Sequence, residues 1–141
     1  NTLTTEKHAM KFKLIGITLF IVSIILLTGC NRVKPIHNVQ DTPYPTWQGQ
    51  NVTQEDISKA IMKAGRSLTW IMQKKDKGHI EGTLVLRSHT AIVDIYYDDS
   101  KYSIMYKDSE NLLHEGNYIH RNYHNWVINL TRTINTYLSE L

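Results

Sequence analysis

The stretch HIEGTLVLRSHTAIVDIYYDDSKYSIMYK, residues 79–107, has the pattern that most clearly indicates how the chain folds. Apolar and polar residues alternate along it, and short polar links divide it into three runs. An earlier alternating run ends at the turn sequence DKG, residues 76–78. Alternation with a period of two, interrupted by short polar turns, is typical of antiparallel strands. The sequence therefore predicts a four-stranded antiparallel meander, with strands at 66–74, 79–87, 90–97 and 101–107.

Amphipathic helices are predicted on both sides of this meander. Thr53 and Asp56 fit a capping box that begins a helix over 54–64, and Gly65 fits its C-terminal position. A longer helix is predicted over 121–139. Its apolar residues recur at helical spacing: Tyr123, Trp126, Val127, Leu130, Ile134, Tyr137, Leu138 and Leu141. Two such helices need an apolar sheet face to cover, which predicts a two-layer α+β domain over 53–141.

Strand alternation also predicts what lies on the opposite face of the sheet. Thr69, Thr83, Asp94 and Lys107 are expected there, with Asp94 pairing with Lys107 or Arg87. The apolar residues expected among them are Ile71, Val85, Ile92, Tyr96 and Met105. This set of residues is unusually apolar for a sheet face in contact with solvent, which predicts that the face is a surface for a partner. The alternative is that the preceding segment covers it, through Tyr44 and Trp47.

The segment before the domain has the features of a secretory leader. Lys11 and Lys13 precede an uncharged apolar run over 14–27. A spanning helix needs ~20 apolar residues, so this run is short for one. Positive residues, a short apolar run and small residues predict a signal peptide over 10–29 that starts at Met10. Residues 1–9 are expected to be an upstream extension outside the fold, and an uncleaved N-terminal anchor is the alternative.

The leader ends in Leu27-Thr28-Gly29-Cys30, which resembles a bacterial lipobox. The resemblance implies that the Cys30 thiol receives a diacylglycerol, that the chain is cut before Cys30, and that the new amino group is acylated with a fatty acid such as palmitate. Two or more acyl chains hold a protein stably on a membrane. Asn31, rather than Asp, favours the outer membrane over the inner membrane.

Residues 30–52 are expected to be a tether between the lipid and the domain. They include all three prolines, which favour extended backbone. Such a segment could reach ~50–60 Å. The leader and its extension hold three of the 16 basic residues and one of the 13 acidic residues, so the mature chain has a net charge of about +1. This charge argues against nucleic acid as a partner.

The C-terminal half resembles a family of small proteobacterial lipoproteins of uncharacterised function. The resemblance rests on YSIMYKDSENL (102–112), IHRNYHNWVINLTRTI (119–134) and AGRSLTW (64–70). It implies an envelope location and a small α+β domain. It implies no catalytic or ligand-binding residues.

Polar residues between the last strand and the final helix form a candidate loop site of Asn111, His120 and Asn122. The structural alternative is that they bond loop backbone and fix the helix. His114, His120 and His124 have a spacing that could suit a divalent metal, but no metal or other cofactor is expected. No nucleophile elbow, P-loop or HExxH motif occurs.

These features predict a non-enzymatic lipoprotein of the bacterial envelope. It is expected to be anchored through Cys30, to face the periplasm, and to act as a binding or structural module for another envelope component. A periplasmic small-molecule or metal-binding protein is the alternative function.

Overall fold

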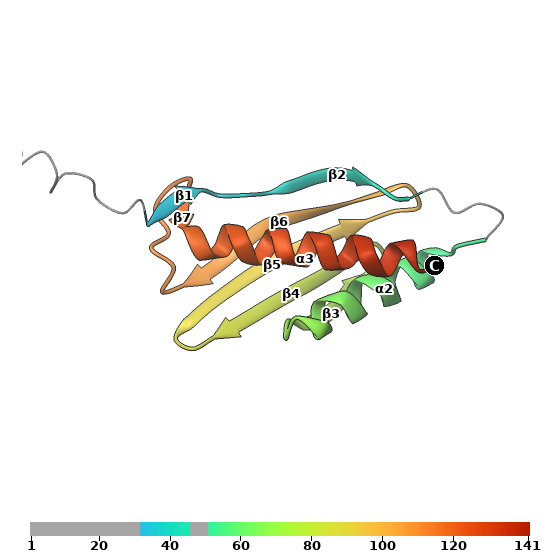
Figure 1. The fold of residues 1–141 in the computed structure, drawn as a ribbon, viewed down its shortest axis with the longest axis horizontal. Helices are drawn as coiled ribbons and strands as arrows, with labels where there is room; N and C mark the ends of the chain where they lie inside the picture. The colour runs from blue at the N-terminus through green and yellow to red at the C-terminus, as the bar shows by residue number, and fades with distance from the viewer. Residues whose placement is uncertain (1–31, 46–50) are drawn as a thin grey trace, which may run out of the picture. The chain divides into compact units, whose positions relative to one another are not determined.

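The computed structural model describes residues 32–45 and 51–141, and in this part of the chain a five-stranded antiparallel sheet lies at the centre (Figure 1). The strand order is β2-β6-β5-β4-β3. The strands are β2 (Val39–Pro43), β3 (Ile71–Asp76), β4 (His79–Leu86), β5 (His89–Tyr97) and β6 (Lys101–Glu110). A separate ribbon pairs β1 (Val33–Pro35) with β7 (Tyr118–His120).

Two helices cover one face of this sheet (Figure 1). They are α2 (Gln54–Ser67) and α3 (Arg121–Ser139), and the bounds of α3 are those predicted from the sequence. The predicted capping box of α2 is confirmed, because the Asp56 backbone N–H donates to Thr53 Oγ1 at 3.2 Å and the Thr53 N–H donates to Asp56 Oδ2 at 3.1 Å. The α+β class and the C-terminal helix are confirmed.

The core lies between the helices and the covered face of the sheet. Ile57 and Ile61 of α2 and Leu130 and Ile134 of α3 are buried there. The sheet contributes alternate residues of its three central strands, all buried: Ile80, Leu84, Ala91, Val93, Ile95, Tyr97, Tyr102 and Ile104. The alternation seen in the sequence thus places one residue of each pair in the core.

The prediction of a four-stranded sheet preceded by a tether is wrong at residues 33–43. These residues form β1 and β2, and β2 pairs with β6 as a fifth strand, with Val39 opposite Ile104 and Pro43 opposite Lys101. Proline cannot donate to a ladder, but it is tolerated in an edge strand such as β2. Tyr44 then docks on the domain, where its hydroxyl donates to Lys101 O at 2.7 Å. Trp47 lies outside the described residues.

The first helix and the first strand of the meander also differ from expectation. Gly65 lies inside α2, which continues to Ser67, and β3 begins at Ile71 rather than at residue 66. A side chain at position 65 would displace Met72, because a Cβ there would lie 2.3 Å from Met72 Sδ. The chain instead turns at Thr69, which has a φ of 67°.

Neither α2 nor α3 is long and apolar enough to cross a membrane, and this holds for the described residues only. The predicted signal peptide, Cys30 and Asn31 lie outside the described residues.

Candidate functional site

The face of the sheet opposite to the helices, here called the open face, contains all five residues of the predicted partner surface. The strand register places Ile71 opposite Thr83, Thr83 opposite Ile92, and Asp94 opposite Met105. Ile71 is 57% exposed, Val85 55% and Tyr96 47%. Ile92 and Met105 are only partly exposed. The accessible apolar side chains therefore lie toward the margins of the open face.

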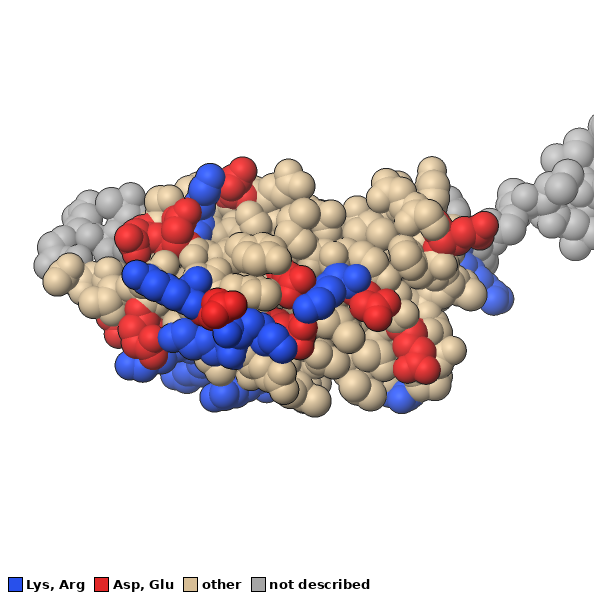
Figure 2. All heavy atoms as spheres, turned by 180° about the vertical axis from the view of Figure 1, so that it is seen from behind, with Lys and Arg blue, Asp and Glu red and all other residues tan. Residues whose placement is uncertain are grey.

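A charged network occupies the middle of the open face. Lys107 Nζ donates to Glu81 Oε2 at 2.5 Å and lies 3.5 Å from Asp94 Oδ1. Lys75 Nζ lies 3.5 Å from Glu81 Oε1, and His79 Nε2 lies 2.7 Å from Asp94 Oδ1. The hydrogen bond from Lys107 holds the pKa of the Glu81 carboxyl below its ordinary value. Figure 2, which views the molecule from behind, shows acidic and basic side chains intermixed across this region.

This network explains why the open face can hold apolar residues without being a continuous apolar patch. The predicted pairing of Asp94 with Lys107 is confirmed, and no carboxylate in the described part of the chain lies within ion-pair distance of Arg87. The ring of His79 stacks on Tyr96 with centroids 4.7 Å apart. The face thus offers a central set of charges flanked by Ile71, Val85 and Tyr96.

The three residues of the predicted loop site are close in space and bond mainly to backbone. Asn111 Nδ2 donates to Ser88 O at 2.7 Å, and Asn111 adopts a φ of 57°. His120 is the N-cap of α3, and its Nδ1 accepts from the Asn122 N–H at 3.2 Å. The Asn111 bond joins the loop to the turn between β4 and β5, and the His120 bond caps the start of α3. Both bonds support the structural alternative, in which these residues bond loop backbone and fix the helix.

The three histidines considered for a metal site do not converge. His114 lies against the Tyr106 ring, with centroids 4.9 Å apart. His120 and His124 instead face histidines that the sequence spacing did not indicate: His89 at 6.4 Å and His37 at 4.5 Å between centroids. Within the described ranges, no group of three His, Cys, Asp or Glu side chains is arranged to hold a metal ion.

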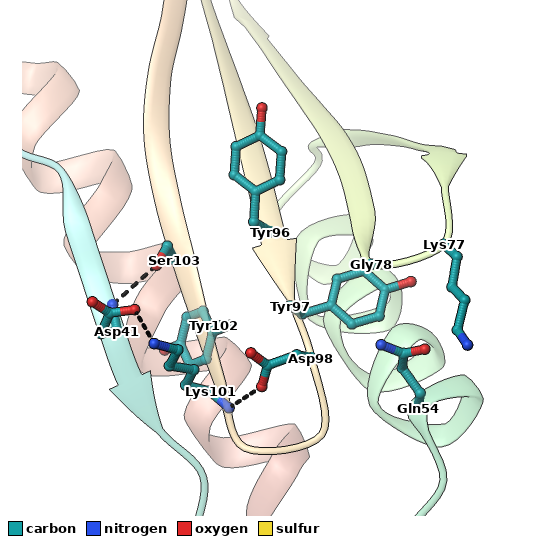
Figure 3. A pocket seen from close by; sticks show the side chains of 10 residues that line it. All are labelled: Asp41, Gln54, Lys77, Gly78, Tyr96, Tyr97, Asp98, Lys101, Tyr102 and Ser103. Carbon is teal, nitrogen blue, oxygen red and sulfur yellow. Dashed lines mark hydrogen bonds and ion pairs between the residues drawn. The ribbon is translucent and has the colours of Figure 1, made fainter.

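A cavity of about 360 Å³ lies at the end of the sheet where β2, the β5–β6 turn and the start of α2 meet (Figure 3). The Tyr97 ring points toward Gln54 and Gly78, whereas Tyr96 points away from them (Figure 3). Two of the acidic residues that line the cavity are bonded to Lys101: Asp41 Oδ1 lies 2.8 Å from Lys101 Nζ, and Asp98 Oδ1 accepts from the Lys101 backbone N–H at 3.0 Å. Nothing in the sequence pattern indicated this cavity, because it is assembled from four separate segments.

Comparison with known proteins gives no relative from which a function could be transferred: no protein-family model, no curated protein and no solved structure matches the chain.

Proposed function

We propose that this protein is a non-enzymatic lipoprotein of the bacterial envelope, anchored through Cys30 and facing the periplasm. The observation that carries the proposal is the sequence Leu27-Thr28-Gly29-Cys30 at the end of the apolar run. The resemblance of residues 64–134 to small proteobacterial lipoproteins supports it, and Asn31 favours the outer membrane. Its role is to bind or position another envelope component.

The anchor is tested by replacing the acylated residue. A Cys30→Ser chain expressed in a Gram-negative bacterium should remain an uncut precursor and should lack the added mass of the acyl groups. The matched control is Asn31→Gln, which keeps Cys30 and should be acylated and cut like the unchanged chain. An acylated, processed Cys30→Ser protein would contradict the proposal.

The open face is the partner surface in this proposal, because it presents Ile71 and Val85 to solvent beside the Glu81–Lys107 pair. A photo-crosslinking residue at Val85 should capture an envelope component in cells. Ile71→Lys should abolish this capture without changing the melting temperature, since Ile71 is 57% exposed. An unchanged set of captured components in a folded Ile71→Lys chain would contradict a partner at this face.

The alternative, a periplasmic small-molecule-binding protein, is favoured by one observation, the cavity in Figure 3. Lys77 lines it, and no described carboxylate lies within ion-pair distance of its ammonium group. Under this alternative, native mass spectrometry of the protein purified from cells should show a retained small molecule of constant mass. Lys77→Ala should release it.

A further inference from the structure

The chain enters the described domain at an end that is fixed to the fold from Arg32 onward. The Arg121 N–H donates to Arg32 O at 2.8 Å, and β1 pairs with β7, with Val33 opposite His120. Arg32 lies only two positions after Cys30 in the sequence. Two residues span at most ~7 Å. An acylated Cys30 therefore brings this end of the domain to the bilayer surface, whereas the tether expected from the sequence would have held it tens of ångströms away.

Apolar side chains are presented to solvent at the same end. Leu113 is 58% exposed and Tyr118 is 53% exposed. With Val33 and the turn at 115–117 they line an open hollow of about 580 Å³. Leu113 also has a φ of 52°, a left-handed conformation that is costly for a residue with a branched side chain. A leucine held in this conformation and pointing to solvent adds little to the core, so a contact outside the domain would account for its position.

The end is also rich in positive charge. Arg32 directly precedes β1, Lys34 lies on β1 and Arg121 begins α3, and none of them has a described carboxylate within ion-pair distance. The first turn of α3 contains no acidic residue, so the positive end of its dipole is not neutralised there. Glu115 is the one acidic residue that lines the hollow, within the part of the chain that the structure describes.

We propose that this end, made of Arg32, Lys34, Leu113, Tyr118 and Arg121, lies against the bilayer that holds Cys30. Leu113 and Tyr118 enter the headgroup region, where aromatic side chains with a polar tip are favoured. The three cations contact the phosphates of anionic phospholipids. The proposal rests on the acylation of Cys30. A bilayer is the occupant because the short covalent link from Cys30 to Arg32 holds this end of the domain at the membrane surface.

Such a contact would orient the rest of the molecule. Strand β6 runs from Lys101 to Glu110, so its two ends are ~30 Å apart. Glu110 lies near the proposed contact, since Asn111 and Leu112 lead directly into Leu113. The β5–β6 turn therefore points away from the membrane, and the open face stands exposed along the side of the domain, where an envelope partner can reach it.

The test uses a thiol label on the full chain. Cys30 is the only cysteine, and acylation consumes its thiol, so Leu113→Cys offers a single free thiol for an environment-sensitive fluorophore. The protein is placed in vesicles of phosphatidylethanolamine and phosphatidylglycerol containing a spin-labelled lipid quencher. The label at Leu113→Cys should emit at shorter wavelength and be quenched several-fold. The label at Asp99→Cys, in the β5–β6 turn, should show neither change.

Mass spectrometry of the same samples separates the possible failures. An unacylated chain would overturn the lipoprotein function and this proposal together. An acylated chain whose label at Leu113→Cys is unquenched would overturn this proposal alone. If a thiol-reactive crosslinker at Leu113→Cys captured a protein in cells, the occupant would be a protein and not the bilayer.

The cations are tested by lipid composition and by charge reversal. Replacing phosphatidylglycerol with phosphatidylcholine should reduce the quenching at Leu113→Cys, and raised salt should reduce it further. Adding Arg32→Glu and Lys34→Glu should have the same effect. Lys59→Glu on α2, in a hollow that is also lined by Glu140 at the C-terminal end of α3, should not. Quenching that is insensitive to lipid charge would overturn the role assigned to the cations.

Discussion

The two faces of the sheet are built from alternate residues of the same strands, yet different forces hold them. On the covered face Ile80, Ile95 and Ile104 are each fully buried at 0% exposure. On the open face the central contacts are the ion pairs of Glu81 and Asp94 with Lys107. Burying an Ile contributes about 1.5–3 kcal/mol, whereas an exposed ion pair contributes about 0–1 kcal/mol. The stability of the domain therefore resides mainly in the covered face, which leaves the open face available for binding.

The largest expected difference comes from making the same substitution on each face. Ile95→Ala should lower the free energy of unfolding by about 2–5 kcal/mol, because it leaves a cavity in the core. Ile71→Ala removes the same atoms from a side chain that is 57% exposed and should cost less than about 1 kcal/mol. Urea unfolding of the two variants measures the contrast. Equal losses would show that the open face is as tightly packed as the covered one.

The elements with strong local patterns were predictable from the sequence. Helix α3 and the start of α2 followed from apolar spacing and from the capping box at Thr53. Strand alternation assigned Ile71 and Val85 to the open face and gave Lys107 as one of two possible partners of Asp94. These features depend on residues close together in the chain, or on a period that persists along a strand.

The features that were missed depend on partners distant in sequence. Strand β2 is short and contains Pro43, and it is held by pairing Val39 with Ile104, which no local pattern indicates. Gly65 resembles a helix end in the sequence, but it is fixed by its distance to Met72 across the core. The contact between His37 and His124 likewise requires β1 to lie beside α3.

The packing of the covered face can be tested next at Gly65. Alanine normally stabilises a helix relative to glycine by about 1 kcal/mol. Here the added Cβ would lie 2.3 Å from Met72 Sδ, so Met72 must move within the core. Gly65→Ala should therefore destabilise the domain by about 1–3 kcal/mol, the cost of overpacking. Thermal melting measures it, and combining the change with Met72→Ala should remove most of the added cost of the Cβ. A more stable Gly65→Ala chain would show that the covered face has room to spare.

The open face is tested by removing its central cation. Lys107→Met should destabilise the domain only slightly, since the Lys107 side chain is 42% exposed and solvent screens its ion pairs. The loss should shrink at high salt.

The pKa of Glu81 is lowered by Lys107, so the unfolded chain takes up a proton at higher pH than the folded chain does. The stabilisation is thus present above the unfolded pKa and lost as pH falls through the folded pKa. Lys107→Met should have a weaker acid dependence than the unchanged protein, as measured by urea unfolding from pH 7 to pH 3.

The smallest expected effect lies on the covered face and has the opposite dependence on pH. Tyr102 is buried, and its hydroxyl donates to Asn135 Oδ1 of α3 at 2.7 Å. Burial raises the pKa of Tyr102 to about 12. The unfolded phenol loses its proton at lower pH than the folded one, so this stabilisation is present below the unfolded pKa of 10.0 and is lost as pH rises toward the folded value.

At pH 7, Tyr102→Phe should cost about 0.5–1 kcal/mol for the lost hydrogen bond. The difference between the two proteins should narrow as pH rises above 10, with Tyr96→Phe on the open face as the matched control. A difference that stays constant to pH 11 would show that burial does not raise the pKa of Tyr102, and the two faces would then not be distinguished by their response to alkali.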